Sequence, residues 1–202
     1  MALSYAIKHI IMFPGEFGQG KEAYAKLSSE LERQADIYKG LGVNKDDIMK
    51  LLAPRPEGLP EELRIPVVTL GTSVDLKRQA GLAGIQIYYD FSSGYDTAGG
   101  ITFSAPHLIW MQDGSKYLDK SVEWVRSHLG RNERPATQYD GVALGIVSPD
   151  FRKLLRNHTI DLPGTFVGSD APYLHGWIGG PGLGHCFVSR ADPHNGSASC
   201  AG

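Results

Sequence analysis

The chain has 202 residues, of which 42% are hydrophobic and 21% are charged, and these fractions exclude a disordered chain, a collagenous chain and a long coiled coil. A chain of this length can bury one sizeable hydrophobic core, and we expect a single domain over 1–202. Twenty basic and twenty-two acidic side chains give a net charge of -2, without the basic excess that favours nucleic acid or an anionic membrane. We therefore expect neither among its partners.

The first third of the chain predicts an N-terminal arm, two helices and a connector. Residues 1–20 resemble a strand or docking arm without a signal-peptide cleavage site, and no apolar run is long enough to span a membrane, so we expect a cytoplasmic protein. Residues 21–52 favour a helical hairpin, broken near Gly42 and restarted at Asn44 as an N-cap. Residues 53–66 contain four prolines and predict an extended connector.

The remaining part, 67–202, predicts a mixed α+β core. Apolar residues spaced four, three and four apart predict a helix over 117–129. In the final third, alternating segments separated by the glycine-rich turn 179–182 predict a C-terminal β-meander. The fold class is therefore α+β, with an N-terminal helical region, a mixed or antiparallel sheet and this meander. Short apolar or β-branched runs bounded by turn residues predict strands at 67–70, 85–89 and 108–111.

The C-terminal quarter holds most of the side chains that could carry chemistry, including both cysteines of the chain. In a reducing cytosol we expect these cysteines to be thiols. Imidazole and thiolate are the ligands that zinc prefers, so zinc binding is one interpretation, although the cluster has neither a C-x-x-C pair nor two histidines at helical spacing. The candidate zinc ligands are His185, Cys186, His194 and Cys200.

A second interpretation is nucleophilic catalysis, with Cys186 or Cys200 as the nucleophile. His194 would then be the base, with His185 as an alternative, and Asp192 would orient the histidine. No signature of a known cysteine-enzyme family surrounds either thiol. Buried structural thiols that hold the terminal strands against the core are therefore a third interpretation.

The same segment contains aromatic rings that could line a ligand-binding cleft. Trp177 would form its wall, with His175, His185 and Arg190 beside it or at its rim. The two histidines lie on the arms of a predicted hairpin, where they could face each other. The alternative is that the rings belong to the core, because large apolar side chains favour burial.

Several different short motifs are distributed over most of the chain from about residue 31 onward. They are Glu32-Arg33-Gln34 followed by Gly40, the strand 108–114, Asp140-Gly141-Val142-Ala143-Leu144, Gly168-Ser169, Pro172, Trp177, Leu183-Gly184-x-Cys186, Pro193-His194 and Ala198-Ser199-Cys200. This pattern resembles a bacterial family of uncharacterised proteins, a domain of unknown function common in actinobacteria. The chain differs from that family at Asp192, where Asn is usual, and at His185 and Phe187, where the family has tryptophans. The resemblance implies a bacterial cytosolic protein and supplies no mechanism.

These patterns favour an accessory protein that binds a small molecule or a protein partner through a C-terminal Cys/His site. A Cys- or metal-dependent hydrolase or transferase using Cys186, His194 and Cys200 is the alternative. A structural protein with inert thiols is the second alternative. Zinc is the cofactor considered, and a homodimer is among the assemblies that the sequence leaves open.

Overall fold

The computed structural model describes residues 20–88, 96–97, 99–166 and 169–201. The predicted N-terminal arm therefore lies outside the described residues except for Gly20. The α-helices are α1 (Lys21–Tyr38), α2 (Lys45–Met49), α3 (Leu76–Ala83), α4 (Val122–His128), α5 (Gln138–Val147) and α6 (Phe151–Asn157), with 3-10 turns at Lys39–Leu41, Gly71–Ser73 and Ser115–Tyr117. The strands are β1 (Ile65–Thr69), β2 (Gln86–Ile87), β3 (Asp96–Thr97), β4 (His107–Met111), β5 (Glu133–Pro135), β6 (Thr159–Asp161), β7 (Thr165–Phe166), β8 (Asp170–Trp177), β9 (Gly180–Phe187), β10 (Asn195–Ser197) and β11 (Ser199–Ala201).

Two main sheets with helices between them make up the architecture, and the short strands β3 and β7 form a separate antiparallel pair. The first, called the β1 sheet, has the strand order β1-β4-β11-β5, and the second, the β8 sheet, has the order β10-β6-β8-β9-β2. Because β10 and β2 pair in parallel with their neighbours while β6, β8 and β9 are antiparallel, the β8 sheet is mixed. The predicted α+β class with a mixed sheet is confirmed.

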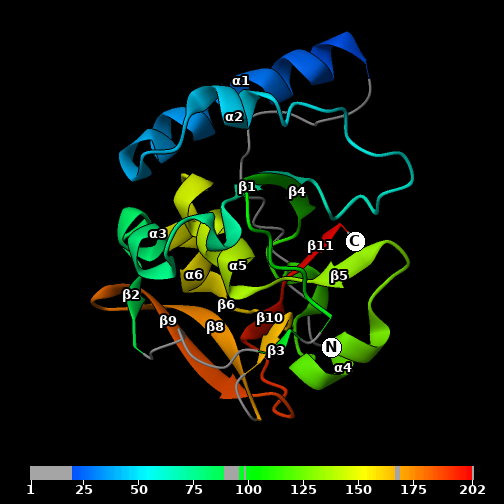
Figure 1. The fold of residues 1–202 in the computed structure, drawn as a ribbon. Helices are drawn as coiled ribbons and strands as arrows, with labels where there is room; N and C mark the ends of the chain where they lie inside the picture. Colours follow the sequence, from blue (N-terminus) through cyan, green and yellow to red (C-terminus); the bar gives the residue numbers. More distant parts are fainter. Residues whose placement is uncertain (1–19, 89–95, 98, 167–168, 202) are drawn as a thin grey trace.

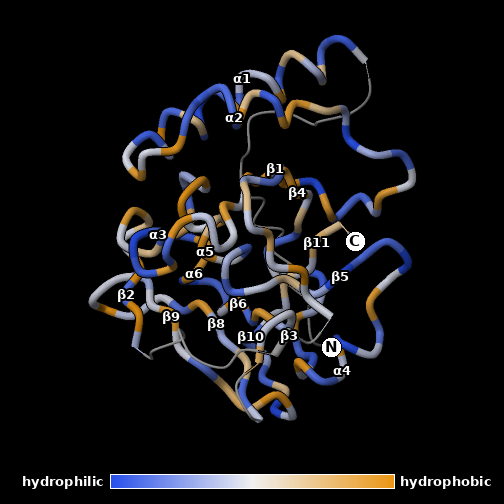
Figure 2. Tube along the Cα trace, viewed as in Figure 1, coloured by the Kyte–Doolittle hydropathy of each residue, from blue (hydrophilic) through white to orange (hydrophobic). Residues whose placement is uncertain are grey.

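The helices α5 and α6 fill the space between the two sheets (Figure 1). α5 contacts β1 on one side and β8 on the other. Apolar side chains of α1, α5, α6 and both sheets form one core, and hydrophobic segments recur along β1, α5 and α6 (Figure 2). No helix in the described ranges is long and apolar enough to cross a membrane.

The predicted helical hairpin over 21–52 is present as α1 and α2, which pack against each other. Gly42 ends the intervening 3-10 turn with a φ of 80°, a left-handed conformation that glycine adopts without strain. The side chain of Asn44 then accepts a hydrogen bond from the amide of Asp46 and caps α2. Irregular structure follows as far as β1, which begins at Ile65.

The helix α1 closes the open edge of the β1 sheet through two side chains. Gln34 Nε2 donates to the carbonyl of Pro66 at 2.8 Å, and Gln34 Oε1 accepts from the amide of Val68 at 2.8 Å. The hydroxyl of Tyr38 donates to the carbonyl of Val68 at 2.5 Å. Proline is tolerated in β1 because this is an edge strand, and position 66 needs no donor toward β4. Backbone groups that would otherwise be unpaired at the edge are thus satisfied by α1.

The helix predicted over 117–129 is shorter than expected, and only α4 is helical. Ser121 caps α4 by accepting from the amide of Trp124, so the helix begins at Val122. Leu118, which the spacing placed on the helical face, instead forms a β-bridge with Gly196 and is 38% exposed. The local cap therefore overrides the apolar periodicity.

The predicted C-terminal meander is present in part. β8 and β9 form an antiparallel hairpin, but its turn is 178–179, and the predicted turn residues from Gly180 onward belong to β9. The meander does not continue beyond β9, because β10 pairs in parallel with β6 and β11 enters the β1 sheet between β4 and β5. The chain therefore ties the two sheets together at its C-terminal end.

Candidate functional site

The β8–β9 hairpin has one face toward the helices and one face away from them. On the inner face, Leu174 lies opposite Leu183, and both are fully buried. A side-chain carbon added at Gly141 of α5 would meet Leu174, which shows that this face packs on α5. Alternation along β8 then places the neighbouring side chains on the outer face, namely Tyr173, His175 and Trp177.

Each aromatic residue of the outer face lies opposite a glycine of β9. The cross-strand pairs are Tyr173 with Gly184, His175 with Gly182 and Trp177 with Gly180. A side-chain carbon at position 182 would lie 2.6 Å from the ring of His175, and one at position 184 would lie 2.9 Å from the ring of Tyr173. The rings therefore rest on a track of glycines, since nothing larger fits beneath the two inner ones.

The rings touch one another and form a continuous row. The ring centroids of Tyr173 and His175 are 5.0 Å apart, and those of His175 and Trp177 are 4.3 Å apart. Tyr88, just after β2, adds a ring 5.6 Å from His175 and 5.5 Å from Trp177. We call Tyr88, Tyr173, His175 and Trp177 the aromatic row. Trp177 is 61% exposed, so the row ends in an indole that is largely open to solvent.

A cavity of about 380 Å³ lies along the aromatic row, and we call it the β8–β9 cavity. Its walls come from β6, β8, β9, β10 and the loop after β9. Phe187, at the opposite end of β9 from the turn, is 64% exposed. The cavity thus has apolar rings at both ends and polar groups along its sides. The lining residues are Thr159, Asp170, Tyr173, His175, Trp177, His185, Cys186, Phe187, Arg190, Asp192 and Asn195.

The polar lining is organised in close pairs. Nδ1 of His185 lies 2.5 Å from Oδ2 of Asp170, and the guanidinium of Arg190 donates to Asp192 at 3.1 Å. The hydroxyl of Thr159 donates to the amide oxygen of the β10 residue beside it at 2.5 Å. Oδ1 of Asp170 is buried and has no hydrogen-bond partner among the described residues. One carboxylate oxygen at the cavity is therefore left without a donor.

The thiol of Cys186 faces a buried carboxyl group. Its Sγ donates to Oδ1 of Asp161 at 3.6 Å. Burial, together with the Asp161 charge, raises the pKa of the Cys186 thiol well above its usual range. Burial also raises the pKa of the Asp161 carboxyl to about 7, and the nearby Asp192 adds to this shift. A thiol with a raised pKa is protonated at neutral pH and is a weak nucleophile.

His175 is the most enclosed polar group of the cavity. It is 2% exposed, and neither ring nitrogen has a hydrogen-bond partner among the described residues. Burial lowers the pKa of the imidazole, which therefore stays neutral at neutral pH. A neutral imidazole carries one donor and one acceptor, and both are unpaired here. Such groups are rare in folded proteins, and they indicate a position that a ligand or an ordered water completes.

The structure brings together the residues predicted to bind a ligand. Trp177, His175, His185 and Arg190 all line the β8–β9 cavity. The two histidines do not face each other, however, because the register pairs His175 with Gly182 and places His185 on the opposite face of the hairpin.

The predicted catalytic and zinc-binding sets are not assembled. Cys186 and Asp192 line the cavity, but the exposed His194 does not, and no hydrogen bond joins His194 to Cys186 in the described structure. Cys200 is fully buried in β11, in the other sheet, where burial and then Asp140 raise the pKa of its thiol. Among the described residues, no three or more His, Cys, Asp or Glu side chains form a group that could hold a metal ion. The two cysteines considered as zinc ligands thus lie in different sheets, and both are free.

Sequence reasoning missed several polar residues of this region, among them Asp161, Asp170 and Asn195. Asp161 lies behind Cys186, Asp170 lies beside His185, and Asn195 lies at the cavity wall. Asp161 and Asn195 reach the hairpin through the pairing of β6 with β8 and of β10 with β6, which are non-local contacts. The position of Asp170 could have been predicted from the sequence. Pairing each aromatic residue of β8 with a glycine of β9 sets the register of the hairpin, and this register places Asp170 opposite Phe187.

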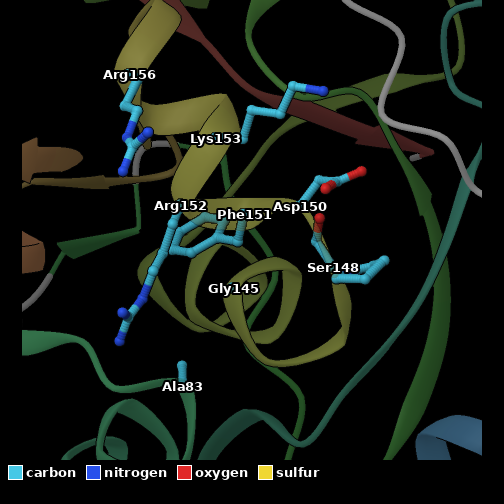
Figure 3. Close-up of a pocket in the computed structure, with 9 residues that line it drawn as sticks. Ala83, Gly145, Ser148, Asp150, Phe151, Arg152, Lys153 and Arg156 are labelled. Carbon is cyan, nitrogen blue, oxygen red and sulfur yellow. The ribbon is translucent and has the colours of Figure 1, made fainter.

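A second cavity, of about 350 Å³, lies at the corner between α5 and α6. Its lining includes three basic side chains, Arg152, Lys153 and Arg156, and the hydroxyl of Ser148, which is buried without a partner in the described structure. Figure 3 shows Arg152 and Arg156 extending to one side of α6, while Lys153 extends to the other and Asp150 lies near Ser148. The cations do not converge on the hydroxyl, and we assign no function to this cavity.

Comparison with known proteins found no matching family model, no similar curated protein and no similar solved structure. The β8–β9 cavity, with its aromatic row and its unpaired polar atoms, is therefore the feature on which a function can be based.

Proposed function

We propose that this protein binds a small molecule in the β8–β9 cavity. The observation that carries the proposal is the aromatic row, which ends in the exposed indole of Trp177 beside a cavity lined by polar pairs. Pockets for small molecules are concave, largely apolar and furnished with a few well-placed polar groups. The β8–β9 cavity has this composition.

The exposure of the rings supports binding over a purely structural role. Trp177 and Phe187 are more than half exposed at the two ends of the cavity, whereas large aromatic side chains are usually mostly buried. Rings that served only to stabilise the hairpin would gain by covering each other more fully. Their open faces are available to a planar ligand.

The contacts of the thiols favour binding over cysteine-dependent catalysis. Cys186 faces the carboxyl group of Asp161, which disfavours the thiolate that a nucleophile requires. Cys200 is enclosed in the core. The proposal therefore assigns Cys186 to the wall of the binding site and Cys200 to the packing of β11.

The proposal extends to the setting of the protein. We place it in a bacterial cytoplasm, in keeping with the family that the chain resembles and with two cysteines that are not bridged. An accessory role that delivers or senses a small molecule fits a cavity in which no activated nucleophile or metal group is found among the described residues.

A fragment screen by saturation-transfer NMR tests the proposal. The library consists of small aromatic and heteroaromatic compounds, screened against the wild type, Trp177→Ala and Trp124→Ala. Trp124 is the matched control, because its ring is also partly exposed but stacks on His128 outside the cavity. We expect compounds that bind the wild type and Trp124→Ala and lose their signal with Trp177→Ala. The same set of binders for all three proteins would contradict the proposal.

A further inference from the structure

The turn of the β8–β9 hairpin exposes apolar side chains at one end of the β8 sheet. Ile178 is fully exposed and Trp177 is 61% exposed, while the ring of Tyr88, 41% exposed, lies 5.5 Å from that of Trp177. From 176 to 184 the chain has no charged side chain and, apart from the indole N–H, no hydrogen-bonding one. We call Tyr88, Trp177 and Ile178 the hairpin tip. Contiguous apolar side chains that are open to solvent mark a site of interaction.

The helix α6 places basic side chains beside the hairpin tip. A side-chain carbon added at Gly176 would lie 3.0 Å from the carbonyl oxygen of Leu155, so α6 packs directly against the strand end that leads into the turn. Arg156 follows Leu155 in the chain, and Arg152, one helical turn earlier, extends to the same side of α6 (Figure 3). Nη2 of Arg152 lies 3.6 Å from the carbon that would be added at Gly84, just before β2. Two cations therefore lie close to the tip.

These arginines have no anionic partner in the part of the chain that the structure describes. Arg152 and Arg156 are exposed, and neither forms a side-chain hydrogen bond or an ion pair with another described residue. The helix α6 contains no acidic residue, and Asp150, just before it, lies near Ser148 instead (Figure 3). The net charge of -2 predicts no attraction of the whole chain to an anionic surface, but the local field at the tip is positive.

The shape of the hairpin tip favours a lipid bilayer over a protein partner. A stable protein interface buries about 800 Å² on each partner, whereas a large aromatic side chain buries only about 150–250 Å², so three side chains do not reach that area. A turn also projects from the surface instead of forming a groove. A bilayer needs no matching shape, because indole and phenol rings favour the headgroup region and arginines favour anionic headgroups.

We propose that the hairpin tip binds reversibly to an anionic lipid bilayer, with Trp177 and Ile178 inserted at the headgroup level and Arg152 and Arg156 paired with lipid phosphates. Two apolar side chains and two cations supply weak, reversible binding and not the permanent insertion of a spanning helix. The proposal does not depend on small-molecule binding, because Ile178 and the two arginines do not line the β8–β9 cavity. Trp177 belongs to both sites, so the main tests change the other residues.

Co-sedimentation with lipid vesicles tests the proposal. The vesicles consist of phosphatidylcholine alone or of an equal mixture of phosphatidylcholine and the anionic phosphatidylglycerol. The wild type is compared with Ile178→Ser and with the double variant Arg152→Gln/Arg156→Gln. All three substituted positions are exposed, and circular dichroism establishes that each variant is folded.

Two control variants make the same changes elsewhere on the surface. Ile101→Ser replaces an isoleucine that is 49% exposed in the segment before β4. Arg64→Gln/Arg131→Gln removes the same charge from exposed positions just before β1 and near β5, in the other sheet. The controls therefore separate the position of a change from its chemistry.

We expect the wild type to bind the mixed vesicles and to bind phosphatidylcholine alone much more weakly, with added salt weakening the binding to the mixed vesicles. Ile178→Ser should weaken this binding about tenfold, as the loss of one buried apolar side chain does. Each arginine removed at the tip should weaken it about fivefold, whereas both control variants should bind as the wild type does. Lipids brominated on the acyl chain should quench tryptophan emission in the wild type more than in Trp177→Phe.

Equal binding to the two kinds of vesicle, or binding to neither, would overturn the proposal without any variant. Equal losses in the two arginine pairs, or unchanged binding of Ile178→Ser, would overturn the role of the tip. If sedimentation velocity shows a dimer that Ile178→Ser converts to a monomer, the tip docks on a second copy of the chain and the bilayer is the wrong partner. Ile178→Ser should keep the fragment binding of the wild type, so the two proposals fail or stand separately.

Discussion

Replacement of Gln34 by Met tests whether α1 stabilises the fold by closing the edge of the β1 sheet. The two side chains have similar volume, but Met cannot replace the hydrogen bonds to the amide of Val68 and the carbonyl of Pro66. Both backbone groups are buried. A buried polar group left without a partner costs about 1–3 kcal/mol, so the two together should lower the free energy of unfolding by about 2–6 kcal/mol. That is a large fraction of the ~5–15 kcal/mol typical of a folded domain.

Urea unfolding followed by circular dichroism measures this difference from the midpoint and slope of the transition. Tyr38→Phe is the matched companion, because it removes only the donor to the carbonyl of Val68 and should cost about half as much, roughly 1–3 kcal/mol. A free energy of unfolding for Gln34→Met within about 0.5 kcal/mol of the wild type, the range of ordinary surface substitutions, would refute the reasoning. So would a larger loss for Tyr38→Phe than for Gln34→Met.

Three further predictions concern the β8 sheet. Because the pKa of Asp161 rises to about 7 in the folded protein, the folded state binds its proton more tightly than the unfolded state. Stability should therefore fall by up to about 4 kcal/mol as the pH rises from about 4 through the folded pKa, and it should level off about one pH unit above that pKa. Asp161→Asn should flatten this part of a profile of urea midpoint against pH, and a profile that this substitution leaves unchanged would argue against the raised pKa. Iodoacetamide at pH 8 should modify Cys186 more slowly in the folded protein than in the unfolded chain, and it should modify Cys200 only on unfolding, as measured by mass spectrometry. Faster labelling of Cys186 in the folded protein than in the unfolded chain would be inconsistent with its contacts. Gly182→Ala should lower the free energy of unfolding by about 1–3 kcal/mol, because the added methyl group overpacks the space under the aromatic row. Gly81→Ala on α3, with open space around it, should be neutral or stabilising. Equal effects of the two substitutions in thermal melts would contradict the conclusion that the aromatic row requires glycines beneath it.

The parts of the fold that the sequence predicts well are those set by local signals. The α1–α2 hairpin follows from helix-forming residues, a left-handed glycine at position 42 and the cap at Asn44. The same logic fails at Leu118, where apolar spacing suggests a helix but the cap at Ser121 starts it later. Capping is decided by one hydrogen bond, which periodicity does not detect.

The part of the candidate site that lies on the β8–β9 hairpin was predictable from the sequence. Trp177, His175 and His185 lie on adjoining strands, so their neighbourhood follows from chain order. Cys200 was misplaced because nothing in the sequence indicates that β11 leaves the β8 sheet and pairs with β4 and β5. Asp161 was missed because the pairing of β6 with β8 is non-local. Pairings of this kind depend on the whole core rather than on a motif.

The indole N–H signals of the chain's three tryptophans give the most direct test of the central claim that the β8–β9 cavity is the binding site. One of these indoles is buried, one lies on α4, and Trp177 alone lines the cavity. In ¹H–¹⁵N spectra recorded during a titration with a fragment that binds the wild type in the saturation-transfer screen, we predict that the Trp177 signal and the amides of β8 and β9 shift together and saturate, while the other two indole signals stay in place. Shifts centred on Trp124 or on α6, with the Trp177 signal unmoved, would contradict the account.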